Sequence, residues 1–87
     1  MYLVELAFDG SPDRLALRPA HRERLQQLRD AGRLVMAGPF ADESGAILIF
    51  DVASESEVAS LVDEDPYYRA KGVTVVRTQE WTPVVKA

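Results

Sequence analysis

Hydrophobic side chains occupy every second position at the start of the chain, namely Tyr2, Val4, Leu6 and Phe8. This period is typical of a strand that buries one face. We therefore predict a first strand over residues 2–8. The strand should end at Asp9-Gly10-Ser11-Pro12, where four turn-forming residues follow one another.

A helical pattern follows this turn. Good helix formers run from Pro19, which suits a first helical turn, to Ala31, and Gly32 suits the position just past a helix end. We therefore predict a helix over residues 19–31. Its inner stripe should hold three residues spaced by four and three, His21, Leu25 and Leu28. Polar residues should cover the other side: Arg22, Glu23, Gln26, Arg29 and Asp30.

Two apolar runs, Leu34 to Ala37 and Ala46 to Val52, are separated by a polar turn and predict an antiparallel hairpin. The first run ends at Gly38-Pro39, because proline cannot continue a strand ladder. The second run is apolar at consecutive positions, and its strand should therefore be central in the sheet.

The last third of the chain predicts a short helix and a final strand. Ser54 and Glu57 match the capping-box pattern of a helix start. Asp65-Pro66 should stop this helix, because a residue before proline avoids the helical region. Val73 to Trp81 is rich in β-branched residues and reads as a strand.

The element order is β-α-β-β-α-β, which predicts one ferredoxin-like α+β domain over residues 1–87, with a four-stranded antiparallel sheet. Two helices can cover only one face of such a sheet. Ile47 and Ile49 should lie on the uncovered face. A second copy of the chain is the simplest cover, so we expect a homodimer with a barrel-like interior.

Composition narrows the function classes. The chain has 87 residues, a net charge of −4 and no cysteine. An acidic chain is a poor candidate for nucleic-acid binding, and no apolar run is long enough to cross a membrane. No signal-peptide pattern opens the chain, so we expect a cytoplasmic protein. The arginines between positions 14 and 33 alternate with Asp13, Glu23 and Asp30, which favours a solvated helix face with ion pairs.

Metal and cofactor chemistry find little support in the sequence. A single histidine without cysteine does not provide a usual zinc or iron site. The five glycines are scattered and form no phosphate-binding loop. We therefore expect no metal and no cofactor.

His21 is the one side chain that ordinarily titrates near neutral pH. Asp9 and Asp65 are the candidates to orient its ring, because both lie in turn-like segments at element ends. A structural alternative exists for each: His21 as a core residue, Asp9 in an Asx-turn, and Asp65 as part of a helix stop. A nearby carboxylate raises a histidine pKa and burial lowers it. The sequence leaves the net direction open.

Several short motifs resemble the YciI-like (YCII-related) family: Arg18-Pro19-Ala20-His21, Ala31-Gly32-Arg33-Leu34, Ala37-Gly38-Pro39, Asp65-Pro66-Tyr67 and a closing Trp81. The resemblance spans residues 2–81 and implies a dimeric α+β barrel. It also implies an active-site cleft with a histidine, here His21, and aspartates, here Asp9 and Asp65. The turn from Phe40 to Gly45 is shorter than the loop of many relatives, which should remove part of a pocket wall.

The resemblance also guides the functional hypothesis, since one branch of the family removes halide from a chlorinated ring by proton abstraction. We expect a small-molecule ligand in the cleft, with Arg18, Gly38, Pro39 and Tyr67 as candidate binding residues. The leading hypothesis is an enzyme with a His-Asp proton-transfer site that acts on a small cyclic or aromatic metabolite, as an isomerase, lyase or dehydrochlorinase. The alternative is a non-catalytic small-molecule-binding or accessory domain.

Overall fold

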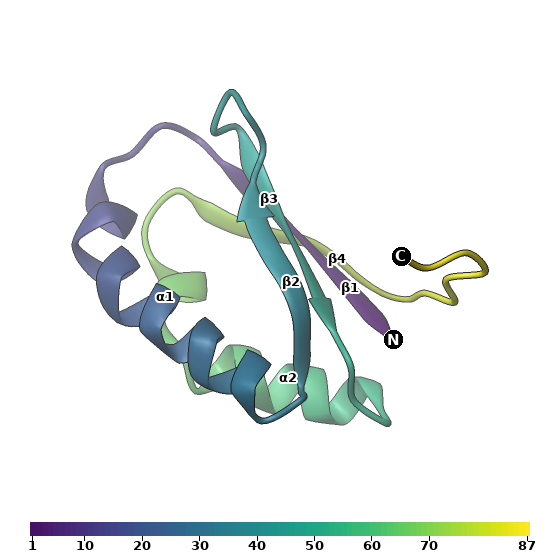
Figure 1. Ribbon diagram of the computed structural model, residues 1–87. Coiled ribbons are helices and arrows are strands. Elements are labelled where there is room, and N and C mark those ends of the chain that lie inside the picture. The colour runs from purple at the N-terminus through teal and green to yellow at the C-terminus, as the bar shows by residue number, and fades with distance from the viewer.

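A four-stranded sheet with helices on one face makes up the computed structural model, which describes residues 1–87 (Figure 1). The strands are β1 (Tyr2–Phe8), β2 (Leu34–Pro39), β3 (Gly45–Phe50) and β4 (Val73–Glu80). The helices are α1 (Asp13–Asp30), α2 (Glu55–Asp63) and the short 3₁₀ helix η1 (Pro66–Arg69). The strand order is β2-β3-β1-β4, and all neighbours are antiparallel. The predicted ferredoxin-like α+β fold and its central β3 strand are confirmed.

The core lies between this sheet and the helices. Val4 of β1 pairs with Leu48 of β3, and both side chains are completely buried. Val58 and Leu61 of α2 join the same cluster, while Leu25 and Leu28 of α1 pack at its margin. The alternation of β1 and the spacing of the apolar residues on both helices therefore meet in one apolar layer.

Helix α1 begins at Asp13 and not at Pro19, so the predicted start is wrong. Pro19 lies inside the helix, where it removes only one backbone N–H, and the preceding turn already forms through a hydrogen bond from the Leu15 N–H to the Pro12 carbonyl. His21 consequently lies in the third turn and not beside the helix N-terminus.

No helix combines the length and apolar character that crossing a bilayer requires.

The end of α1 follows the sequence prediction. Gly32 has a φ of 76°, a left-handed conformation that glycine adopts easily. Its N–H donates to the Arg29 carbonyl, and the Arg33 N–H donates to the Leu28 carbonyl. These are the two hydrogen bonds of a Schellman motif, which turns the chain directly into β2.

The start of α2 is only partly as predicted. The Ser54 hydroxyl accepts a hydrogen bond from the Glu57 N–H at 3.3 Å, which is one half of the capping box. The Glu57 carboxylate forms no return bond to Ser54 and instead lies 4.0 Å from Arg33. The helix is therefore capped by one side chain, and the second carboxylate helps connect α2 to the end of α1.

The opposite face of the sheet carries no helix. Because Leu48 points into the core, its strand neighbours Ile47 and Ile49 point to this uncovered face. Met36 pairs with Ile49 and is 66% exposed there. The edge towards β4 is polar, with Glu5 and Arg77 in an ion pair at 3.0 Å. The uncovered face is thus apolar on the β2 side and charged on the β4 side.

Candidate active site

A histidine and a carboxylate meet beneath α1. His21 Nδ1 lies 2.6 Å from Asp65 Oδ2, and the two side chains are 7% and 6% exposed. A short contact between two buried polar groups fixes both of them. Of the two aspartates proposed from the sequence, Asp65 is the one that orients the ring.

The chain around Asp65 explains how this carboxylate is held. Asp65 precedes Pro66 and has the extended backbone that a residue before proline adopts. Its Oδ1 accepts a hydrogen bond from the Tyr67 N–H at 3.0 Å, which caps η1. Its Oδ2 remains for His21. The Asp-Pro sequence therefore has a structural role and also presents one carboxylate oxygen to the histidine.

The second ring nitrogen of His21 faces open space. Asp65 occupies Nδ1, whereas Nε2 has no hydrogen bond within the chain. No buried side-chain nitrogen or oxygen lacks a partner, so Nε2 keeps some exposed surface, and His21 is one of the residues that line the cavity. When Nδ1–H donates its hydrogen bond to the Asp65 carboxylate, the neutral ring carries its lone pair on Nε2. His21 is therefore arranged as a base towards the cavity.

Burial determines the protonation state of this ring. Loss of solvent lowers the pKa of His21 below its usual 6.5, and the hydrogen bond and charge of Asp65 oppose this shift only in part. Arg22 and Arg24 lower the pKa further by charge repulsion. The net direction that the sequence leaves open is therefore downward, and the imidazole is neutral at pH 7.

The lowered pKa predicts how stability depends on pH. Below about pH 6.5 the histidine of the unfolded chain binds a proton that the folded chain resists. The free energy of unfolding should therefore fall as the pH drops from 7 through the window between 6.5 and the lower folded pKa. Urea denaturation of the wild type and of His21→Gln at several pH values checks this. An equal pH dependence in both proteins would contradict it.

Aromatic rings hold His21 from two sides. The Tyr67 ring stacks on the imidazole with centroids 3.9 Å apart and planes 6° apart. The Tyr68 ring meets it edge-on at 5.3 Å, and burial raises the pKa of Tyr68, so its hydroxyl stays protonated. The Tyr67 hydroxyl accepts a hydrogen bond from Arg14 at 3.2 Å. Its own proton remains available to donate.

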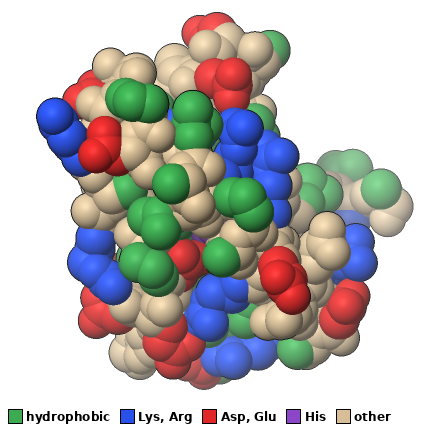
Figure 2. All heavy atoms as spheres, turned by 90° about the vertical axis from the view of Figure 1, so that its left-hand side faces the viewer, with side chains coloured by type: hydrophobic (Ala, Val, Ile, Leu, Met, Phe, Trp, Pro, Cys, Tyr) green, Lys and Arg blue, Asp and Glu red, His purple; other side chains and the backbone are tan.

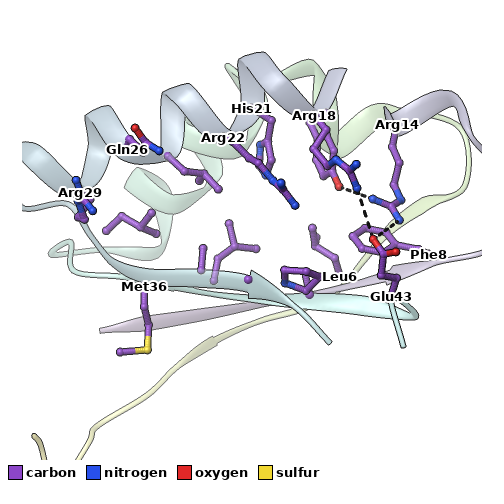
Figure 3. Close-up of a pocket in the computed structure, with 18 of the residues that line it drawn as sticks. Leu6, Phe8, Arg14, Arg18, His21, Arg22, Gln26, Arg29, Met36 and Glu43 are labelled. Carbon is purple, nitrogen blue, oxygen red and sulfur yellow. Dashed lines mark hydrogen bonds and ion pairs between the residues drawn. The ribbon is translucent and has the colours of Figure 1, made fainter. Parts of the chain in front are cut away.

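The cavity lies between α1 and the sheet and has a volume of about 440 Å³. Figure 3 shows Arg18, His21 and Arg22 reaching from α1 towards the sheet, with Leu6 and Phe8 opposite them. The four binding candidates from the sequence all line this space, namely Arg18, Gly38, Pro39 and Tyr67. Such a volume suits a small organic molecule.

Asp9 lies outside this site. Its carboxylate accepts a hydrogen bond from the Ser11 N–H at 2.8 Å, which is an Asx-turn. Hydrogen bonding to Ser11, first through its side chain and then through its backbone N–H, lowers the pKa of Asp9. The side chain forms no hydrogen bond to His21 and does not line the cavity. Asp9 therefore forms the Asx-turn of the structural alternative and does not lie beside the histidine.

The arginines of α1 match the sequence expectation only in part. Arg22 and Arg29 are exposed as predicted, whereas Arg14 is buried and Arg18 is half-buried, and all four line the cavity. Only one ion pair uses an interleaved acid, Arg29 with Asp30. Charged groups of both signs are interspersed with apolar ones on the α1 side of the molecule (Figure 2). The helix start at Asp13 is the signal that was missed, because it puts Arg14 and Arg18 on the stripe of His21.

The short β2–β3 turn contributes one side chain to the cavity wall. Glu43 of this turn belongs to the lining. Its Oε1 lies 3.7 Å from Arg14 Nη2 and 3.5 Å from Arg18 Nη1. The turn thus contributes a carboxylate to the site that sequence reasoning did not identify.

Comparison with known proteins gives consistent matches. The family model described as the YCII-related domain matches residues 1–82. Protein YciI of Escherichia coli O6:H1 (strain CFT073) is 38% identical over 72 residues, which cover 71% of this chain and 74% of the relative. Protein YciI of Shigella flexneri matches with the same identity and coverage.

Proposed function

The chain belongs to the YCII-related family, and from this premise we propose that it is an enzyme that moves a proton on a small cyclic or aromatic metabolite. The observation that carries the proposal is the hydrogen bond between Asp65 and His21 Nδ1, which leaves Nε2 open to the cavity. A buried carboxylate that orients a neutral imidazole is an arrangement well suited to general acid–base catalysis.

The chemistry follows from the position of Nε2. The Nε2 lone pair takes a proton from a ring carbon, and the electron pair of that C–H bond moves to a carbonyl oxygen of the substrate. The imidazolium that forms is stabilised by Asp65. In an isomerase the electron pair returns from the oxygen to another carbon, which takes the proton back from the imidazolium. In a lyase or dehydrochlorinase the electron pair instead expels a leaving group such as chloride, and the imidazolium releases its proton to solvent. The Tyr67 hydroxyl, held by Arg14, is a donor for the oxygen that gains charge.

Solvent hydrogen exchange tests this proposal without knowledge of the natural substrate. A panel of cyclic enones, lactones and ring carboxylates is incubated in D₂O and followed by NMR for deuterium at carbon. We expect exchange on members of the panel with the wild type, and a rate lower by about 10²–10⁴-fold with His21→Asn. Arg33→Gln, which changes a residue outside the cavity, serves as the control. Binding of panel members without any exchange would instead favour a non-catalytic binding domain.

A cytoplasmic homodimer completes the proposal. The uncovered sheet face carries Met36, Ile47 and Ile49, and Trp81 just after β4 is 43% exposed. Covering the exposed parts of Met36 and Trp81 would contribute roughly 25 cal/mol per Å² of apolar area, whereas Ile49 is already buried. Light scattering should report twice the 9.7 kDa of one chain. A particle of 9.7 kDa at micromolar concentration would contradict the dimer.

A further inference from the structure

Positive charge is concentrated in the cavity although the whole chain has a net charge of −4. Four arginines line it, and Glu43 is the one acidic residue among the lining side chains. The potentials of several positive side chains around a cleft add together and raise the local concentration of anions. The lining is therefore suited to a negatively charged ligand. This charge preference narrows the choice of ligand further than the size of the cavity does.

Glu43 already places a carboxylate on two of these cations. Its Oε1 reaches both Arg14 and Arg18, as the dashed lines in Figure 3 show. The N···O distances of 3.7 and 3.5 Å are longer than those of good charge-assisted hydrogen bonds. The Glu43 side chain is 57% exposed, and its φ of 57° is disfavoured for a residue other than glycine. A carboxylate thus fits beside Arg14 and Arg18, but the carboxylate of Glu43 interacts with them only weakly.

Arg22 is the cavity arginine that has no anionic partner. It forms no ion pair and no side-chain hydrogen bond within the chain, and it lies one helical turn from Arg18. In Figure 3 both guanidinium groups extend into the space between α1 and the sheet. A planar guanidinium presents two parallel N–H groups that match a carboxylate. Arg22 is therefore a free anion-binding group in the same cavity as His21.

We propose that the cavity binds a small organic carboxylate through Arg18 and Arg22, and that Glu43 competes with this ligand for Arg18. The inference rests on the proposed function and names its substrate class. The seated Glu43 side chain favours a carboxylate over a phosphate, because it shows which anion the arginines already accommodate. A volume of about 440 Å³ accommodates a carboxylate that carries one ring.

Calorimetric titration with benzoate, the neutral benzamide and phenyl phosphate tests the proposal. We expect benzoate to bind at least about tenfold more tightly than benzamide, since a charge-assisted bond is lost in the amide. Arg22→Gln should weaken benzoate binding by about 10- to 100-fold. Arg33→Gln removes the same charge outside the cavity and should leave the affinity nearly unchanged. Glu43→Gln should tighten binding by about threefold or more, because the internal competitor loses its charge.

The outcomes separate this inference from the proposed enzyme activity. His21→Asn should keep benzoate binding while it loses proton exchange, so binding is judged independently of catalysis. Equal affinity for benzoate and benzamide, equal losses in Arg22→Gln and Arg33→Gln, or no binding of any probe would overturn the inference. Much tighter binding of phenyl phosphate than of benzoate would overturn the carboxylate assignment. Proton exchange on uncharged panel members only would overturn the carboxylate inference and leave the proposed enzyme activity supported.

Discussion

Replacing Phe50 with alanine is expected to lower the free energy of unfolding by about 3–5 kcal/mol. Phe50 ends β3, is 1% exposed and is the largest fully buried side chain of the core. Its strand lies between β1 and β2, with Tyr2 and Leu34 as its pairing neighbours. The vacated space would therefore be lined by a sheet that cannot collapse. Urea denaturation followed by circular dichroism measures the loss.

Phe40→Ala is the matched control for this prediction. Phe40 lies just after β2 and is 40% exposed, so the same truncation removes far less buried area. We expect a loss of about 1 kcal/mol. If the two substitutions cost the same, the core would not depend on the inner face of β3 in the way described above. A domain with a total stability of about 5–15 kcal/mol should show the difference clearly.

The sheet could be predicted from the sequence because its signals are local. The alternation from Tyr2 to Phe8 gives β1 its observed bounds, since the side chains of a strand alternate between its faces. The end of α1 was equally predictable, because Gly32 supplies a conformation that few other residues adopt. The start of α1 was not. Proline is common in a first turn, and only the packing of the whole helix shows that Pro19 is tolerated in its interior.

The site was predicted less completely because it depends on contacts between distant segments. His21 and Asp65 are 44 positions apart and meet because α1 packs against η1. Asp9 and Asp65 look alike in sequence, as short acidic side chains in turns, and only this packing distinguishes them. The sequence predicts Arg22 on the polar side of α1, and its side chain is exposed there. It also lines the cavity beside His21, which the helical pattern alone does not indicate.

Asp65→Asn is expected to slow proton transfer by about 10²–10⁴-fold while the fold is retained. Asp65 uses one oxygen to cap the Tyr67 N–H and the other to accept from His21. Asparagine has one oxygen and one NH₂ group. If the oxygen keeps the cap, the NH₂ faces His21 Nδ1, which must then accept. The ring proton moves to Nε2, and the lone pair that faces the cavity is lost.

The same substitution should lower the pKa of His21 further. Asp65 raises this pKa through its hydrogen bond and its charge, and both contributions oppose the effect of burial. Without them, burial and the charges of Arg22 and Arg24 act alone. NMR titration of the single histidine gives the pKa, and its ¹⁵N shifts give the tautomer. Asp9→Asn is the control, since Asp9 has no contact with the ring. Unchanged exchange rates and an unchanged tautomer in Asp65→Asn would show that the carboxylate has only its capping role.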